Sequence, residues 1–281
     1  MENYSVLTTI YAKDTSIALK QCIDSMLAQT VITNDYVIVA DGPISQDLSD
    51  VIISYKEKYE FINFVQMPEN KGLGLALNEG LRHCKNDLVA RLDADDISLK
   101  ERCELQLKEF EKDPELAMVG SDMYEFEDDP NNINSIKVMP HTYEEVYKYG
   151  KRRNAFNHSS VMYKRSIVAK CGNYSTKKRS QDVELFSTIL ANKYKCININ
   201  EPLIKYRTGS SQIQRRQKWE DVRSDLKVFY SNYKIGYSGI FDYLYALITH
   251  VVFFLLPELV ANFLYKKIFR KSVSRPIFQR I

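Results

Sequence analysis

The sequence lacks several features that would assign it to a specialised class of protein. Its five cysteines are odd in number, widely spaced and without a CxxC pair, which argues against a disulfide framework and against a zinc site. The net charge of only +3 gives no reason to expect a nucleic-acid partner. The sequence contains no internal repeat and no low-complexity tract. An ordinary globular protein in a reducing compartment remains as the expected class.

The first residues of the sequence also lack the pattern of a secretory signal. They carry Glu2 and have no basic segment followed by a long apolar run. We therefore expect a cytoplasmic protein. The chain has 281 residues, of which 44% are hydrophobic and 27% charged, enough for one α/β domain with an appendage.

Strands and helices are predicted to alternate along the first hundred residues. Apolar, β-branched runs predict buried strands, and apolar residues at helical spacing predict helices between them. The strands are expected at residues 5–10, 36–40, 62–66 and 87–92, and the helices at residues 16–29, 48–59 and 72–84. This alternation is typical of βαβ units and of a mostly parallel sheet flanked by helices.

The following hundred residues have a less regular pattern. They favour strands at residues 117–124 and 159–163, a loop at residues 127–134, a helix at residues 181–192, and strand-like pieces around Pro202. The same α/β class is expected to continue through this part of the chain.

Polar residues follow three of the predicted strands. These are residues 9–11, Asp41 after a second strand, and residues 93–96 after a third. In parallel α/β sheets, ligands bind beyond the carboxyl ends of the strands. We therefore expect these residues to converge on one crevice.

The segment at residues 93–96 places three carboxylates within four positions. In an extended chain Asp93 and Asp95 project to the same side, where they repel each other unless a cation lies between them. Mn²⁺ or Mg²⁺ bridging a diphosphate suits such an arrangement. The alternative is a solvated turn in which Asp96 or Ser98 caps the next helix. The position at a strand end favours the metal site.

Six segments, in order, resemble the family 2 inverting glycosyltransferases, which have the GT-A nucleotide-diphospho-sugar transferase fold. Residues 5–11, 38–42, 70–78 and 92–96 resemble the nucleotide-binding half of that family, and residues 157–162 and 181–186 resemble its acceptor side. The likeness covers about residues 4 to 210, and its specificity lies in the order of the segments.

The resemblance implies how the donor nucleotide is bound. Thr9 and Tyr11 would line the nucleoside pocket, and Asp41 would accept a hydrogen bond from the base, expected to be uracil. Lys71 would lie near the base or the phosphates, and Asp93 would contact the ribose.

The resemblance also assigns a metal ligand and a base. Asp95 would bind Mn²⁺ or Mg²⁺, and Asp182 would remove the proton of the acceptor hydroxyl. Inversion is a direct displacement, which needs a base on the acceptor side and charge stabilisation on the leaving diphosphate. Without the resemblance, Asp182 is interpreted as the N-cap of the following helix, a common role for Asp, and the two roles are compatible.

Two residues on the acceptor or diphosphate side have two interpretations each. His158 either hydrogen-bonds a sugar or phosphate or is a satisfied structural histidine. Arg207 either neutralises a donor or acceptor diphosphate or belongs to a solvated basic face.

The sequence departs from the family pattern at several positions. Ala40 precedes Asp41 where a second acid is common, Gln181 precedes Asp182 where Glu is common, and Leu77 replaces an arginine. Residues 214–219 also lack the arginine of the motif found in processive members. A non-processive enzyme that adds one sugar is therefore predicted.

The C-terminal part is apolar, aromatic and then basic. Residues 243–265 are long enough for a membrane span but are interrupted by His250, Pro257 and Glu258. Six Lys or Arg residues and no acid lie between 259 and 281. We expect an interfacial helix or a hairpin-like helix pair beside anionic lipids. A helical subdomain packed on the core is the alternative.

The complete prediction has two parts. Residues 1–215 form a GT-A catalytic domain, with residues 1–100 for the nucleotide-sugar and residues 101–215 for the acceptor, and residues 216–281 form a membrane-associating helical region. The expected enzyme transfers one sugar from a UDP-sugar to a sugar or lipid-linked oligosaccharide in capsule, O-antigen or exopolysaccharide synthesis. It would be attached peripherally to the inner face of the cell membrane.

Two alternatives to this enzyme stay open. A metal-dependent nucleotidyltransferase also uses paired carboxylates, but it would be expected to have a Gly-rich phosphate loop, which residues 8–14 lack. An inactive nucleotide-sugar-binding membrane scaffold would be supported by loss of Asp95 or Asp182, and both are present.

Overall fold

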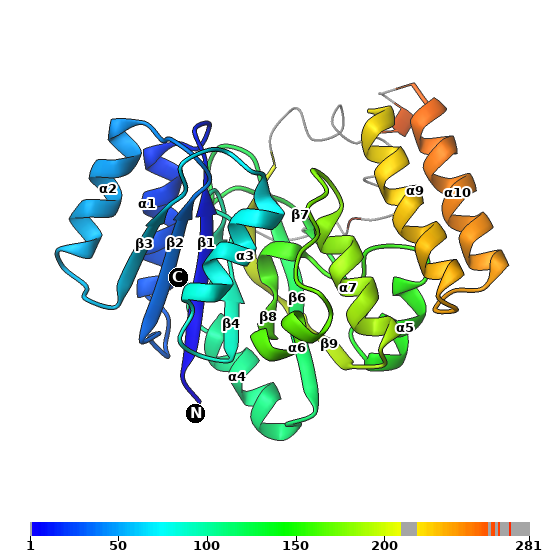
Figure 1. Ribbon diagram of the computed structural model, residues 1–281, viewed down its shortest axis with the longest axis horizontal. Helices are drawn as coiled ribbons and strands as arrows, with labels where there is room; N and C mark the ends of the chain where they lie inside the picture. Colours follow the sequence, from blue (N-terminus) through cyan, green and yellow to red (C-terminus); the bar gives the residue numbers. More distant parts are fainter. Residues whose placement is uncertain (1, 209–217, 258–259, 262–263, 265–269, 271–281) are drawn as a thin grey trace.

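The computed structural model describes residues 2–208, 218–257, 260–261, 264 and 270. Within them, one mixed sheet of nine strands has helices on both faces (Figure 1). The strands are β1 (Tyr4–Ile10), β2 (Asp35–Ala40), β3 (Ile62–Gln66), β4 (Leu88–Arg91), β5 (Ile97–Ser98), β6 (Leu116–Phe126), β7 (Ile133–Lys137), β8 (Met162–Lys164) and β9 (Lys195–Arg207). The helices are α1 (Ser16–Leu27), α2 (Gln46–Lys56), α3 (Leu73–His83), α4 (Arg102–Lys112), α5 (Tyr143–Gly150), the 3₁₀ turn η1 (His158–Ser160), α6 (Arg165–Lys170), α7 (Gln181–Ala191), α9 (Trp219–Lys234) and α10 (Ile240–Leu255).

The first half of the sheet is parallel, as predicted. The strand order is β3-β2-β1-β4-β8-β6-β9-β5, with β7 beside β6. β1 pairs in parallel with both β2 and β4, and β2 with β3. β8 then runs antiparallel to β4 and β6, so the second half is mixed. The predicted α/β class is confirmed.

Alternation along the strands produces two apolar layers. Val6 and Ile38 face a cluster closed by α1, α2 and α4, whereas Leu7, Val37 and Val39 face a cluster closed by α3, α6 and α7. Because both faces of β1 and β2 are covered, nearly every residue in them is buried, as expected of parallel strands. Burial of each aliphatic side chain contributes about 1.5–3 kcal/mol to the free energy of folding. The two apolar layers therefore hold the strands, and with them the strand ends, in place.

Short polar residues or glycine occupy the N-cap positions of the first three helices. Thr15 accepts a hydrogen bond from the Ala18 amide at the start of α1, and Ser45 caps α2 in the same way. Gly72 precedes α3 at a φ of 93°, a conformation that favours glycine. These caps set where each chain segment leaves the sheet edge.

Several elements differ from the prediction. The segment around Pro202 is one long strand, β9, because its pairing with β6 shifts register near Pro202 instead of ending there. Residues 127–134 are not entirely loop, since β7 begins at Ile133. The expected strand at residues 159–163 is divided into η1 and β8.

The C-terminal helices also differ from the expected pair. α10 begins at Ile240 and packs against α9, which lies inside the region predicted to be helical but was given no bounds by the prediction. The two helices lie side by side at the edge of the molecule (Figure 1). Among the described residues, no helix combines the length and apolarity needed to cross a bilayer. Most of residues 258–281 lie outside the described residues, and so do all of residues 209–217, which include four of the six residues compared with the processive motif.

Gly42 provides a test of how tightly the β2 end is packed. It has a φ of 87°, and an added Cβ would lie 2.5 Å from the Asn70 amide nitrogen. We expect Gly42→Ala to lower the free energy of unfolding by about 2–4 kcal/mol, from backbone strain and from displacement of the facing loop.

Gly172→Ala is the matched control for this substitution. Its φ is 91° but an added Cβ would meet nothing within 4 Å, so it has the strain without the clash. Urea unfolding should show a clearly smaller loss for Gly172→Ala, about 1 kcal/mol. Equal losses at the two positions would show that the contact near Asn70 does not matter.

Candidate active site

Three neighbouring strand ends bring the predicted donor-side residues together. β2 and β4 lie on either side of β1, and the Asp41 amide donates to the Ile10 carbonyl at 2.8 Å. The Leu92 amide donates to the Leu7 carbonyl at 3.1 Å. The polar segments after β1, β2 and β4 therefore share one edge of the sheet, as expected.

Asp41 is buried and organises the loop before α3. Its Oδ1 accepts from the Lys71 amide at 2.7 Å and its Oδ2 from the Gly72 amide at 2.9 Å. The Lys71 ammonium is exposed and lies 3.4 Å from a Glu69 carboxylate oxygen. The structure thus places Asp41 and Lys71 together, and their contacts with a nucleotide stay predictions.

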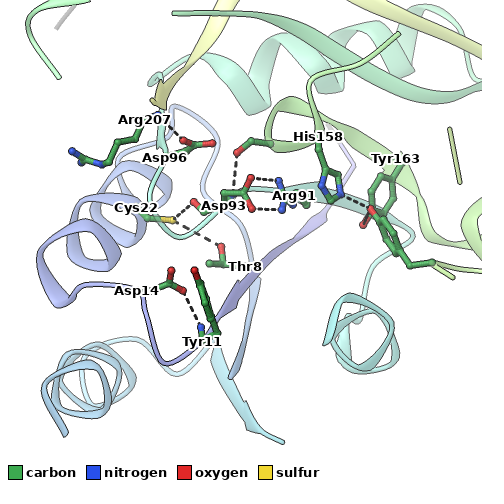
Figure 2. A network of polar contacts seen from close by, with 12 residues as sticks. Thr8, Tyr11, Asp14, Cys22, Arg91, Asp93, Asp96, His158, Tyr163 and Arg207 are labelled. Carbon is green, nitrogen blue, oxygen red and sulfur yellow. Dashed lines mark hydrogen bonds and ion pairs between the residues drawn. The ribbon is translucent and has the colours of Figure 1, made fainter. Parts of the chain in front are cut away.

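Thr9 and Tyr11 lie at the end of β1, beside this loop. Thr9 is buried, whereas the Tyr11 side chain is exposed. The Tyr11 amide donates to Asp14 Oδ2 at 2.9 Å (Figure 2). The Tyr11 side chain is therefore accessible from solvent at the sheet edge, whereas the Thr9 side chain is not.

Asp93 is held by a buried arginine that sequence reasoning missed. Arg91 is 1% exposed, and its two terminal nitrogens donate to the two carboxylate oxygens of Asp93 (Figure 2). The Asp93 amide donates to Ser159 Oγ at 3.0 Å, which joins the acid segment to η1. An arginine inside an apolar strand was the available signal, because such a group is rarely buried without a partner.

Asp95 is exposed to solvent, but protein atoms surround its carboxylate closely enough to desolvate it. Burial of the site, followed by the charge of Asp93, raises the pKa of Asp95 to about 6. Asp14 has the same environment: burial, with smaller effects of Asp95 and Asp93, raises its pKa to about 7. Asp14 was also missed, because it lies far from residues 93–96 in sequence.

Asp96 is fully buried and does not cap a helix. Its Oδ1 accepts from the Arg207 amide at 2.9 Å, and its Oδ2 has no hydrogen-bond partner. Burial, followed by the charges of Asp95 and Asp93, raises the pKa of Asp96 well above its usual range. The next helix, α4, has Glu101 at its N-cap position, so the interpretation of Asp96 or Ser98 as a cap is wrong.

Arg207 lies against the acid segment from β9. Its Nε donates to the Asp95 carbonyl at 3.2 Å, one terminal nitrogen reaches Gln21 Oε1 at 2.7 Å, and its guanidinium lies over the Phe126 ring. The structure therefore brings Arg207 to the same edge as Asp95, rather than to a separate solvated face.

The carboxylates fit a divalent cation of the type that also uses substrate phosphates. The described residues hold no cluster of three His, Cys, Asp or Glu side chains that would bind a metal by themselves. Mg²⁺ and related ions often use one or two carboxylates, with phosphates and waters completing the shell. The exposed Asp95 carboxylate and the unpartnered Asp96 oxygen, both with raised pKa values, are suited to a nearby positive charge.

Asp182 lies in the first turn of α7, close enough to Arg91 to feel its charge. The helix has Ser180 at its N-cap position, so the interpretation of Asp182 as the cap is wrong. Asp182 Oδ2 accepts from Asn154 Nδ2 at 2.9 Å. Burial raises the pKa of Asp182, and the nearby charge of Arg91 acts in the opposite direction. A carboxylate with a raised pKa is a stronger base once ionised.

A cleft of about 1320 Å³ contains this side of the site. Asp93, His158 and Asp182 line it together with residues of α5, α9 and α10. Residues 9–11, Asp41, Lys71 and Asp95 are outside its lining. The predicted site residues therefore divide into a sheet-edge group and a cleft group, with Asp93 between them.

His158 has the contacts of a satisfied structural group. Its Nε2 lies 3.0 Å from the Tyr174 hydroxyl, and its ring packs against Tyr174 and Phe186. Burial, with a smaller effect of Arg91, lowers the pKa of His158 well below its usual value, so the ring is neutral. A direct role of His158 toward an acceptor remains a prediction, since the ring also lines the cleft.

Comparison with known families gives one match to a family model, described as glycosyl transferase family 2, over residues 5–172. A beta-1,3-galactosyltransferase of Escherichia coli, named for a UDP-Gal donor and a GlcNAc-diphosphoundecaprenol acceptor, is 32% identical over 95% of this chain and 97% of its own length. An amylovoran biosynthesis glycosyltransferase of Erwinia amylovora is 30% identical over 94% of this chain and 98% of its own length.

Solved structures share the fold at low sequence identity. A mannosyltransferase of Pyrobaculum calidifontis, in complex with GDP-Man and Mn²⁺, matches with a TM-score of 0.64 and 15% identity over 92% of this chain and 71% of that one. S. aureus TarS in complex with UDP-GlcNAc matches with a TM-score of 0.61 and 12% identity over 93% of this chain and 70% of that one. These likenesses confirm the GT-A fold.

The Arg91–Asp93 pair predicts strong energetic coupling. In a double-mutant cycle of Arg91→Met and Asp93→Asn, we expect Arg91→Met alone to cost about 2–4 kcal/mol of unfolding free energy, because it leaves a half-buried carboxylate without its partner. The coupling energy should be about 1–3 kcal/mol, measured by urea unfolding. Losses that add to within about 0.5 kcal/mol would show that the pair is not coupled.

The raised pKa of Asp14 predicts a pH-dependent stability. Since the folded-state pKa is about 7, against an unfolded value near 4, the group favours folding at low pH and loses that contribution as pH rises through 7. Asp14→Asn removes this titration. In EDTA, we expect its stability relative to wild type to rise by about 1–2 kcal/mol between pH 5 and pH 8. A stability difference that is constant over this range would contradict the assignment.

Proposed function

The chain belongs to glycosyl transferase family 2, and from this membership we propose that it is an inverting, non-processive glycosyltransferase that moves one sugar from a UDP-sugar to a sugar or lipid-linked acceptor. The observation that carries the proposal is the division of the carboxylates between the sheet edge and the cleft. Asp95 and Asp96 lie toward the sheet edge, and Asp182 lies in the cleft.

On the donor side, the proposal uses residues of the sheet edge. Tyr11 and the loop held by Asp41 are positioned to contact a nucleoside. Asp93 would contact the ribose while Arg91 fixes its orientation. Asp95 would hold Mn²⁺ or Mg²⁺, which when bound supplies positive charge for the leaving diphosphate. Arg207 adds a cation at the same edge.

On the acceptor side, Asp182 acts as the general base. It takes the proton of the acceptor hydroxyl as the hydroxyl oxygen forms a bond to the anomeric carbon and the bond from that carbon to the diphosphate oxygen breaks. UDP leaves with the bonding electron pair. Asn154 orients the Asp182 carboxylate, and Arg91 opposes the protonating effect of burial.

The acceptor and pathway are proposed from the relatives. The Escherichia coli relative is named for a diphosphoundecaprenol-linked acceptor and the Erwinia amylovora relative for amylovoran biosynthesis. A cleft of about 1320 Å³ is large enough for an oligosaccharide end with part of its carrier. We place this chain in synthesis of a surface polysaccharide: capsule, O-antigen or exopolysaccharide.

The location and domain division follow from that acceptor. We propose that residues 1–215 are the catalytic domain and that residues 216–281 attach it to the inner, cytoplasmic face of the cell membrane. α9 is bound to the catalytic part through Ser180 with Asp225 and through Asn232 with Ser187, so the two parts are continuous. Family membership argues against the nucleotidyltransferase alternative. A measurement of sugar transfer distinguishes the proposed enzyme from the inactive scaffold.

Two substitutions test the division of roles. Asp95→Asn should abolish stabilisation of the protein by UDP with Mn²⁺ in thermal unfolding, because the proposed metal ligand is lost. Asp182→Asn should keep that stabilisation but lower the rate of sugar transfer about 10²- to 10⁴-fold, as expected for loss of a general base. A set of nucleotide sugars, with and without Mn²⁺, provides the donors.

Glu184→Gln is the matched control. Glu184 lies in the same turn of α7 and pairs with Lys177 at 2.6 Å, but it does not line the cleft. Its transfer rate should remain within about twofold of wild type. No activity with any donor would refute the proposed function and favour the inactive scaffold. Full activity in both Asp variants would refute the roles proposed for Asp95 and Asp182.

A further inference from the structure

α10 presents an apolar stripe along one side. The exposed side chains are Ile240, Phe241, Leu244, Ile248, Val252 and Leu255. Phe241 is 81% exposed and Ile248 61% exposed. Their spacing of three and four residues places them on one helix face, called here the α10 stripe. A contiguous exposed patch of large apolar side chains marks an interaction surface.

The opposite face of α10 is already occupied. Tyr243 packs against Tyr230 and Tyr233, and His250 packs against Phe229. These contacts fix the rotation of α10 against α9. The α10 stripe consequently points away from α9, on the outer helix of the pair (Figure 1).

Cations lie along one flank of the stripe. Arg152 pairs with Asp242, and the guanidiniums of Arg152 and Arg153 lie 5.0 and 5.8 Å from the centre of the Tyr245 ring. Asp242 is the single acid in α10, and its charge is matched by Arg152. An apolar helix face with basic and tyrosine side chains at its edge suits the headgroup region of a membrane.

The chain beyond α10 adds to the same charge. Besides Arg270, which pairs with Glu125, residues 259–281 contain Lys266, Lys267, Lys271, Arg275 and Arg280 and no acid. A segment of this composition is attracted to the negative charge of anionic lipids. A second copy of this chain would present like charge and would be repelled.

From these observations we propose that the α10 stripe docks on an anionic lipid surface, with α10 lying in the plane of the membrane. Tyr245, Thr249 and Phe253 of the same helix line the cleft that contains Asp182. At helical spacing these residues adjoin the stripe, so the docked helix brings the cleft to the edge of the lipid surface. This inference rests on the proposed function, because it gives a lipid-linked acceptor a short route to the base.

The test is sedimentation of the full chain with vesicles of phosphatidylcholine and phosphatidylglycerol. The double variant Phe241→Glu/Ile248→Glu should lower the bound fraction, expressed as a partition coefficient, at least about tenfold. Both positions are exposed on a helix, so the fold should be retained. The control is Ile17→Glu/Ile53→Glu, at exposed apolar positions of α1 and α2, which should bind vesicles like wild type.

Equal binding of both double variants, or no binding of wild type, would overturn the proposal. Light scattering that shows a wild-type dimer lost in the α10 variant would assign the stripe to a second copy and would also overturn it. Donor hydrolysis by wild type and each variant, measured without lipid, shows whether a failed docking test also means failure of the proposed function. The α10 variant should hydrolyse donor at the wild-type rate, whereas failure of the function would abolish hydrolysis in wild type as well.

Discussion

The ion pair between Arg91 and Asp93 is the contact on which the arrangement of the site depends. Arg91 is fully buried at the end of β4, and both terminal nitrogens bind one carboxylate. A guanidinium removed from water is tolerated only with such a partner. The pair fixes Asp93 at the boundary between the sheet edge and the cleft, and it joins β4 to the segment containing Ser159.

The charge of Arg91 also acts on both sides of that boundary. It lowers the pKa of Asp95 and of Asp182, in each case against the larger effect of burial. It contributes to the neutral state of His158. One buried cation therefore helps keep the proposed metal ligand and the proposed base ionised, although the two carboxylates lie in different parts of the site.

The sequence allowed the α/β alternation and the positions of the strand-end residues to be predicted, because both follow from local patterns. Strand β3 was predicted at its observed limits, and Asp41 and Asp93 follow strands as expected. Elements set by distant packing were harder to locate. Strand β5, which was missed, is held by its pairing with β9, and α9, which lies in the region predicted to be helical without bounds, packs on α7 and α10. Asp96 resembled a cap by its local sequence, and only its burial against Arg207 shows otherwise. Arg91 and Asp14 were overlooked because their importance comes from contacts across the sheet edge.

In the proposed mechanism, donor and base lie on opposite sides of the reacting centre, which requires attack from the face opposite the leaving diphosphate. The most direct measurement is therefore the anomeric configuration of the product, determined by NMR. With an α-linked UDP-sugar and a sugar acceptor, a single displacement assisted by Asp182 predicts a β-linked product. An α-linked product would show retention of configuration and would contradict the proposed mechanism.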